Sequence, residues 1–407
     1  MELFFLAMLF LLMMYALGSG YPVAFALPGS AIITIVVAGI VGQVFTGDSG
    51  AYFIQDGPVE WLTAGVINFR GIYWEVERDT LIAIPLFIFM GIMLQRSKIA
   101  EDLLVTMAQL FGPMPGGLGI SVVFVGALLA ATTGIVGATV VAMGLISLPA
   151  MLRNNYSQSL ATGTICASGT LGQIIPPSIV LIILADQLSN AADQAQATRQ
   201  SLYKEATGDI SMPSDLSVVS TSAGDMFLGA FIPGIVLVLL YMAYILISAI
   251  LRPNTAPAVQ YDGKLLERDF ILKVLLALIP PLALIFVVLG SIIAGIATVN
   301  QAGAIGAVGA TIMAAYRLHE GRKGAFYPAI LSIVSVAVIY LLLQNYNLNI
   351  RSVEAVNNRA GIAMAIIAVA VFVVSVIWSL WRTFKVDDTL KGVMQETAKT
   401  TSLVFII

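Results

Sequence analysis

The chain has 407 residues, of which 59% are hydrophobic and 11% charged, and its formal net charge is -3 at pH 7. Soluble domains average roughly 45–50% apolar and about 25% charged residues, so this composition excludes an ordinary soluble protein and predicts a polytopic membrane protein. The single cysteine and single histidine exclude an internal disulfide and a multi-histidine metal site. The small net charge gives no reason to expect a nucleic-acid partner.

Apolar runs in chain order predict an all-α fold with nine membrane crossings and one re-entrant hairpin. The runs are bounded by polar, charged or glycine- and proline-rich segments, as membrane helices are. A helix over residues 99–110 is expected to connect the third crossing to the hairpin. The predicted crossings are residues 3–17, 23–41, 80–95, 156–188, 226–250, 270–289, 296–316, 326–343 and 360–381, and another begins at 402.

The string LLAATTGIVGATVVAMGLISLPAM, residues 128–151, interrupts an apolar segment with small hydroxyl residues and glycines. Each apolar arm within residues 117–151 has about 14 residues and reaches roughly 21 Å, which is short of the roughly 30 Å hydrocarbon core. We therefore expect a helical hairpin that enters the membrane and turns inside it. A polar turn at that depth must be buried in protein or line a wet cavity, which predicts a binding site at the tip.

A second interruption lies at residues 169–178, within the fourth predicted crossing. Pro176 and Pro177 remove two helix hydrogen-bond donors and disfavour helix just before them. A broken helix offers carbonyl oxygens at one half-end and amides with a positive dipole at the other, which suit a sodium ion and an anion respectively. No Asp or Glu lies between Gly112 and Leu184, so a cation would be bound through neutral oxygens.

The predicted site combines the hairpin tip with this break, because the two supply hydroxyl groups and glycines that let backbone approach closely. Two other interpretations stay open: the small residues close-pack between membrane helices, and Gln173 forms an interhelical hydrogen bond instead of a functional contact. Arg153 is expected to anchor the topology, His319 to be a solvated loop residue and Cys166 to be buried. The candidate site residues are Thr132, Thr133, Gly134, Gly137, Ala138, Thr139, Ser168, Gly169, Thr170, Gly172, Gln173, Pro176, Pro177 and Ser178.

Fourteen of the twenty Lys and Arg residues fall in loops on one side of the predicted membrane. The positive-inside rule makes that side cytoplasmic, so the N-terminus is expected in the periplasm and the hairpin opens from the cytoplasm. Residues 20–29 and 295–304 are similar to each other and follow helices of opposite direction. An inverted-topology repeat, with its binding site near the membrane midplane, predicts this pattern.

These residues carry a family resemblance that covers essentially the whole chain. The string AATTGIVGATVVAMGLISLPAMLRNNY, followed by LATGTICASGTLGQIIPPSIVLI, resembles the large membrane subunit of tripartite ATP-independent periplasmic (TRAP) transporters, in their long-chained class. The strings IPLFIFMGIMLQRSKIAEDLL, GIATVNQAGAIGAVGA and ETAKTTSLVFII add to the resemblance.

The resemblance implies a sodium-coupled secondary transporter, not an enzyme, with an elevator-type fold similar to the ion-transporter superfamily. It implies import of a small carboxylate across the bacterial inner membrane, with sodium as the coupling ion and no other cofactor. The implied partners are a periplasmic solute-binding protein, a small four-helix membrane subunit and the lipid bilayer. The competing interpretation of the residues is a channel or a non-transporting membrane assembly subunit, in which the small residues only pack.

The chain departs from the family pattern at two places. Thr298-Val299-Asn300-Gln301-Ala302 stands where the family commonly has Thr-Pro-Thr-Glu-Ala, and an amide is expected to keep the hydrogen bonding. The chain stops at Ile407, before a second hairpin, so we expect a truncated chain. The expected domains are first-repeat scaffold and arm helices at 1–110, transport elements at 111–190 (hairpin 117–151, broken helix 156–188), a periplasmic loop at 191–225, second-repeat scaffold helices at 226–320, an inserted helix pair at 321–385 and the start of an arm helix at 386–407.

Overall fold

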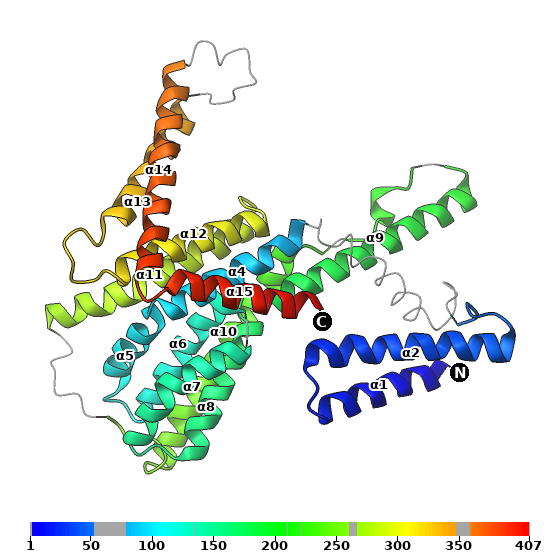
Figure 1. Cartoon of the computed structure of the whole chain (residues 1–407), viewed down its shortest axis with the longest axis horizontal. Helices are drawn as coiled ribbons and strands as arrows, with labels where there is room; N and C mark the ends of the chain where they lie inside the picture. The colour runs from blue at the N-terminus through cyan, green and yellow to red at the C-terminus, as the bar shows by residue number, and fades with distance from the viewer. Residues whose placement is uncertain are drawn as a thin grey trace. The chain divides into compact units, whose positions relative to one another are not determined.

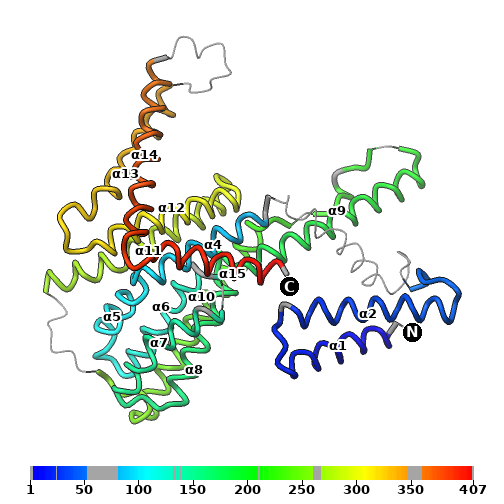
Figure 2. The backbone as a smooth tube through the Cα atoms, in the orientation of Figure 1, coloured from blue at the N-terminus to red at the C-terminus, as the bar shows by residue number. Residues whose placement is uncertain are grey.

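The structure, a computed structural model, describes residues 2–52, 79–134, 136–209, 211–219, 221–259, 267–346 and 359–406. These residues form fourteen α-helices and no strand, which confirms the predicted all-α class (Figures 1 and 2). The chain divides into two compact units, one of Met1–Ile82 with Thr397–Ile407 and the other of Ala83–Glu396.

The first unit is built on an antiparallel pair of helices, α1 (Glu2–Gly18) and α2 (Val23–Thr46). Phe5 and Ala38 are fully buried between them, and the ring centroids of Phe5 and Tyr52 lie 5.3 Å apart. The outer faces of both helices remain apolar and exposed, as expected of helices in a membrane.

The remaining helices follow the predicted order closely. In chain order they are α4 (Asp79–Arg96), α5 (Ile99–Phe111), α6 (Gly117–Thr133), α7 (Val136–Arg153), α8 (Gln158–Thr170), α9 (Ile179–Thr207), α10 (Ala223–Leu251), α11 (Arg268–Ile293), α12 (Val299–Arg317), α13 (Tyr327–Asn345), α14 (Arg359–Lys385) and α15 (Thr389–Ile406). Two 3-10 turns, Leu171–Gln173 and Ser214–Leu216, follow α8 and α9.

The core of the second unit lies around α6, which packs against α5, α8 and α10. Leu103 of α5, Val122 of α6 and Ile165 of α8 are buried in this core. The Tyr156 hydroxyl, in the turn before α8, accepts a hydrogen bond from the Leu118 amide at 3.2 Å. The start of α6 is thereby tied to the turn that leads into α8.

Among the described residues, five helices are long and apolar enough to cross a membrane: α2, α10, α11, α13 and α14. A sixth candidate is the pair α4 and α5, which bends by 59° at its break. Six of the nine predicted crossings correspond to these spans, and those predicted at 3–17, 156–188 and 296–316 are not among them. The run at 156–188, for example, contains a helix α8 of only 13 residues.

The segment predicted as a periplasmic loop is largely helical. Helix α9 continues to Thr207 through much of the loop predicted at 191–225, because its second half is rich in Ala, Gln and other strong helix formers. The chain then folds back, so that Gln196 Oε1 accepts a hydrogen bond from the Val218 amide at 2.7 Å. Helix α15 lies within residues 386–407, where the sequence predicted an arm helix, and it begins at Thr389, before the apolar run at 402.

The side-chain amide of Gln301, at the start of α12, forms the hydrogen bond that the sequence predicted. Gln301 Oε1 accepts a hydrogen bond from the Thr298 amide at 3.0 Å, and Thr298 Oγ1 accepts one from the Gln301 amide at 3.4 Å. This reciprocal capping box satisfies two backbone N–H groups that the helix itself leaves unpaired. Glutamine thus fills the capping position that a glutamate commonly occupies.

Candidate binding site at the hairpin tip

The predicted hairpin turns at Gly134. This residue has φ 60° and ψ 9°, in the left-handed region that favours glycine, and its amide donates to the Ala130 carbonyl at 3.2 Å. Helices α6 and α7 have 17 and 18 residues, so the arms are longer than the sequence predicted. At about 26 Å and 27 Å each is still shorter than a roughly 30 Å hydrocarbon core.

The predicted helix break lies between α8 and α9. After the 3-10 turn Leu171–Gln173 the chain leaves helical geometry and passes through a cis Pro176–Pro177 peptide. Buried Ser178 then starts α9: its Oγ accepts from the Leu181 amide at 3.4 Å and donates to the Gln173 carbonyl at 2.8 Å. This N-cap ties the two sides of the break together.

The hairpin tip and the helix break lie against each other. A Cβ built on Gly134 would be 3.1 Å from Ile179 Cγ1 and 3.4 Å from the Ile179 backbone nitrogen. A Cβ built on Gly172 would be 3.5 Å from Ala130 Cα. Two helix C-terminal ends, those of α6 and α8, therefore meet two N-terminal ends, those of α7 and α9.

Glycine also lets α8 lie directly on both arms of the hairpin. A Cβ on Gly169 would be 2.2 Å from Val140 Cγ2 and 3.1 Å from Val140 Cα, and one on Gly126 of α6 would be 2.7 Å from Ser168 Cβ. Gly137 differs. Among the described residues, no atom of another helix lies within 4 Å of a Cβ built on it. Gly137 is therefore not needed for helix packing among the described residues, and its role at the site stays a prediction.

The hydroxyl-bearing candidates differ in exposure. Thr139, Ser168 and Ser178 are buried, and Ser168 Oγ donates to the Ile165 carbonyl at 2.9 Å. Thr170 and Gln173 are exposed; Thr170 Oγ1 donates to the Ala167 carbonyl at 2.8 Å. The Gln173 side chain makes no hydrogen bond to another described residue, and both interpretations of its role stay predictions. The side chains of Thr132, Thr133 and Ala138 lie outside the described part of the chain.

The four helix ends define what the site can do chemically. Helix C-terminal ends present carbonyl oxygens without helical partners, which ligate cations, and N-terminal ends present free N–H groups, which bind anions. The described residues contain no group of three or more His, Cys, Asp or Glu that could hold a metal ion. Any cation at the tip would thus be held by backbone and hydroxyl oxygens.

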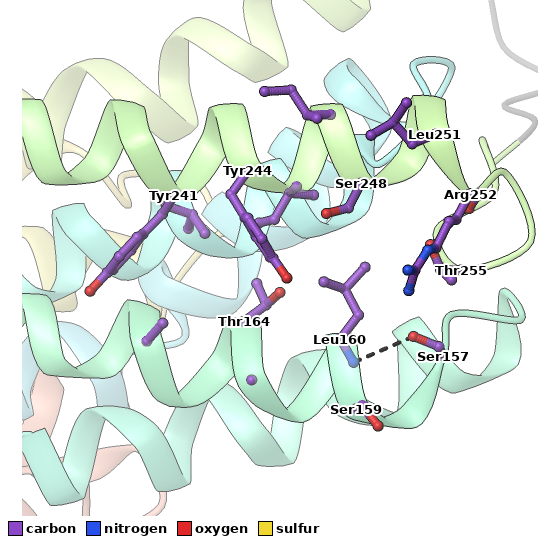
Figure 3. A pocket seen from close by; sticks show the side chains of 15 residues that line it. Ser157, Ser159, Leu160, Thr164, Tyr241, Tyr244, Ser248, Leu251, Arg252 and Thr255 are labelled. Atoms are coloured by element: carbon purple, nitrogen blue, oxygen red, sulfur yellow. Dashed lines mark hydrogen bonds between the residues drawn. The ribbon is translucent and has the colours of Figure 1, made fainter.

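A separate groove of about 860 Å³ lies between α8 and α10 (Figure 3). Seven hydroxyl side chains and the guanidinium of Arg252 line it, and none of its lining residues is Asp or Glu. Figure 3 shows the Arg252 side chain extending between Ser157 and Ser248. The sequence prediction missed the α10 side of the groove. The available signal was the helical spacing of Tyr241, Tyr244, Ser248 and Arg252, which places these polar groups on one face of an apolar helix.

Two further expectations from the sequence need correction. Cys166 is exposed on α8, because this face of the helix has no described helix packed over it. His319 is half-buried in the turn after α12, and is not a freely solvated loop residue.

An all-helical chain with several apolar spans and a hairpin tip that meets a broken helix is a polytopic membrane protein. Over residues 6–197 and 212–407 it matches the family described as "Tripartite ATP-independent periplasmic transporter, DctM component", and the chain belongs to that family. The resemblance to a TRAP large membrane subunit is thereby confirmed.

Several curated relatives are permease subunits. The "C4-dicarboxylate TRAP transporter large permease protein DctM" of Pseudomonas aeruginosa is 31% identical over 60% of this chain and 49% of its own length. The protein of the same name from Vibrio cholerae is 30% identical over 68% of this chain and 52% of its own. The "Ectoine TRAP transporter large permease protein TeaC" of Halomonas elongata is 29% identical over 56% and 45%. The chain spans about half the length of these relatives.

Proposed function

We propose that the chain acts as the large permease subunit of a sodium-coupled secondary transporter that imports a small carboxylate delivered by a periplasmic binding protein. Membership of the DctM family supports the permease role. Two of the relatives above are named for C4-dicarboxylates and the third for ectoine, which supports a small carboxylate-bearing solute. The observation that carries the proposal is the meeting of four helix ends at Gly134 and the break.

In this proposal the cation and the anion use different helix ends. Sodium binds to carbonyl oxygens at the C-terminal ends of α6 and α8, with hydroxyl groups such as that of Thr170 as further ligands. The solute carboxylate meets the N-terminal ends of α7 and α9, where each helix dipole contributes about 0.3–1 kcal/mol, and up to about 2 kcal/mol in a partly buried geometry. The lack of Asp and Glu between Gly112 and Leu184 leaves the anion free of fixed repulsion there.

The proposal extends to the assembly and its movement. The subunit works in the bacterial inner membrane, N-terminus periplasmic, together with a small four-helix membrane subunit and the soluble binding protein. The helices α6 to α9 form the element that carries solute across, in an elevator-type motion. The contacts of Gly169 and Gly172 support this, because they join the hairpin and the broken helix into one element.

The test is sodium-dependent solute uptake by the complete complex in proteoliposomes. Thr170→Ala removes an exposed hydroxyl at the C-terminal end of α8. We expect the half-saturating sodium concentration to rise about tenfold, because the loss of one ligand worth about 1.4 kcal/mol is a factor of ten. Thr162→Ala is the matched control: its hydroxyl is also exposed on α8 and bonds only to local carbonyls, the nearer being Gln158 O at 2.9 Å.

Three results would contradict the proposal. Equal half-saturating sodium concentrations for Thr170→Ala and Thr162→Ala would show that the cation does not bind at the end of α8. Solute flux that follows its own gradient without sodium would identify a channel, and an assembled complex that needs this chain but moves no solute through it would identify an assembly subunit.

A further inference from the structure

Four cationic side chains gather at one end of the α13–α14 pair. Arg322 and Lys323 lie in the turn between α12 and α13, and Arg382 and Lys385 lie in the last turn of α14. The Arg382 guanidinium donates to the Ala325 carbonyl at 2.8 Å and to the Gly324 carbonyl at 3.1 Å. These two hydrogen bonds fix the turn against α14. We call these four residues the basic cluster.

The basic cluster has no acidic partner among the described residues. Nearby Arg317 is neutralised, because it forms ion pairs with Asp102 of α5 and with Glu320. The four cluster residues form none. Asp387 and Asp388 follow α14 and are exposed, yet neither is ion-paired to the cluster. Arg322, Lys323 and Lys385 are exposed and Arg382 is half-buried, so positive charge gathers at this end of the pair.

Aromatic rings lie at the same level as the cluster. The Arg382 guanidinium carbon lies 4.7 Å from the Trp378 ring centroid, and Lys385 Nζ lies 5.0 Å from that of Trp381. The rings of Tyr316 and Phe326 stack at 5.1 Å on the side of the turn. Tryptophan and tyrosine concentrate at membrane–water interfaces, so these rings place the cluster at the headgroup level of a bilayer.

The two helices beside the cluster present apolar side chains outward. Their polar groups face each other instead: Ser332 Oγ and Ser375 Oγ lie 2.7 Å apart, and Ser375 Oγ donates to the Pro328 carbonyl at 2.6 Å. Both helices are long and apolar enough to span a membrane, and Figure 1 shows them as an adjacent pair. Their outer faces suit contact with acyl chains, directly next to the basic cluster.

We propose that the basic cluster binds the phosphate headgroup of an anionic phospholipid, with its acyl chains on the outer faces of α13 and α14. Arginine and lysine recognise phosphate through charge-assisted hydrogen bonds, and basic clusters at helix ends attract anionic lipids. A lipid fits better than a soluble anion because the cations lie next to interfacial rings and to apolar helix faces. A soluble anion would use only the cations. Burial, together with Arg382 and Arg322, lowers the pKa of His319 beside the cluster.

The test compares lipids with identical acyl chains on the purified protein in a non-ionic detergent. Native mass spectrometry measures the binding of phosphatidylglycerol and of phosphatidylcholine. Arg322→Gln with Lys323→Gln is the test variant, because neither side chain holds the fold through a hydrogen bond or ion pair to a described residue. At roughly 1 kcal/mol for each basic residue, we expect about 30-fold weaker phosphatidylglycerol binding and unchanged phosphatidylcholine binding.

The matched control is Lys391→Gln with Lys399→Gln, which removes the same charge from exposed positions on α15. It should change phosphatidylglycerol binding less than twofold. An equal loss in both double variants would show non-specific attraction and overturn the proposal. Displacement of the lipid by millimolar inorganic phosphate would also overturn it, because the site would then select a soluble anion.

Discussion

Gly169→Ala tests the contact that holds α8 on the hairpin. The added methyl group would lie 2.2 Å from Val140 Cγ2 and 3.1 Å from both the Cα and the backbone nitrogen of Val140. Rotation of the valine side chain relieves the first contact, but the backbone atoms can separate only if α7 and α8 move apart. Overpacking of this kind typically costs about 1–3 kcal/mol.

The same substitution also changes helix propensity, so its net effect needs a control. Alanine favours a helix interior over glycine by roughly 0.5–1 kcal/mol. Gly163→Ala has the gain in helix propensity without the overpacking. Gly163 is exposed on the same helix, and no described atom beyond its own helix turn lies within 4 Å of a Cβ built on it. We expect Gly163→Ala to be neutral or stabilising and Gly169→Ala to be less stable than this control by about 1–3 kcal/mol.

The measurement is thermal unfolding of both variants in the same detergent, followed by tryptophan fluorescence. A double-mutant cycle with Val140→Ala then separates the two parts of the contact. Val140→Ala removes Cγ2, so it should rescue part of the loss in Gly169→Ala and leave the part due to the backbone at 3.1 Å. Identical melting temperatures for Gly169→Ala and Gly163→Ala would refute the assignment of this contact.

Two further predictions concern the second half of the chain. Gln301→Ala removes the capping box of α12 and should destabilise the protein by about 0.5–2 kcal/mol. The control is Gln344→Ala, which loses only an exposed hydrogen bond to Tyr340. Equal melting temperatures for the two variants would contradict the capping role of Gln301. The pKa of His319 is lowered below its ordinary 6.5 by burial and by Arg382 and Arg322, so its contribution to stability is complete above pH 6.5 and is lost as the pH falls from there through the folded-state pKa. His319→Gln should flatten that acid limb of the melting-temperature profile, and an unchanged profile would show that His319 is not the responsible group.

The sequence predicted the hairpin and the helix break because both follow from local rules. Glycine at a turn and paired prolines act on their own backbone, and the structure has both features at the expected positions. The arm lengths and the helical second half of α9 were less accurate, because an apolar or polar run does not show where a helix ends. Composition alone cannot separate a helix with polar side chains from a loop.

Tertiary contacts were beyond the sequence for a different reason. Gly137 and Gly169 have the same side chain and were assigned the same role, yet only Gly169 touches another helix. The groove between α8 and α10 likewise needs both helices, whose lining residues are about 80 residues apart in the chain. Local sequence patterns do not show which residues face each other over such a separation. What the sequence supplied was the set of chemical groups, and the fold determined which of them meet.

The glycine contacts constrain how a site at the tip could work. Gly169 of α8 packs against Val140 of α7, and Gly126 of α6 packs against Ser168 of α8, so both arms of the hairpin are in close contact with the end of α8. The Ser178 cap joins that end to the start of α9 across the break. An ion bound between the tip and the break would therefore travel with its whole ligand set, which a site divided between moving parts could not do. If sodium binds there as we propose, Gly169→Ala should weaken sodium-dependent uptake as well as stability, although its methyl group lies on Val140 and not on any proposed ligand.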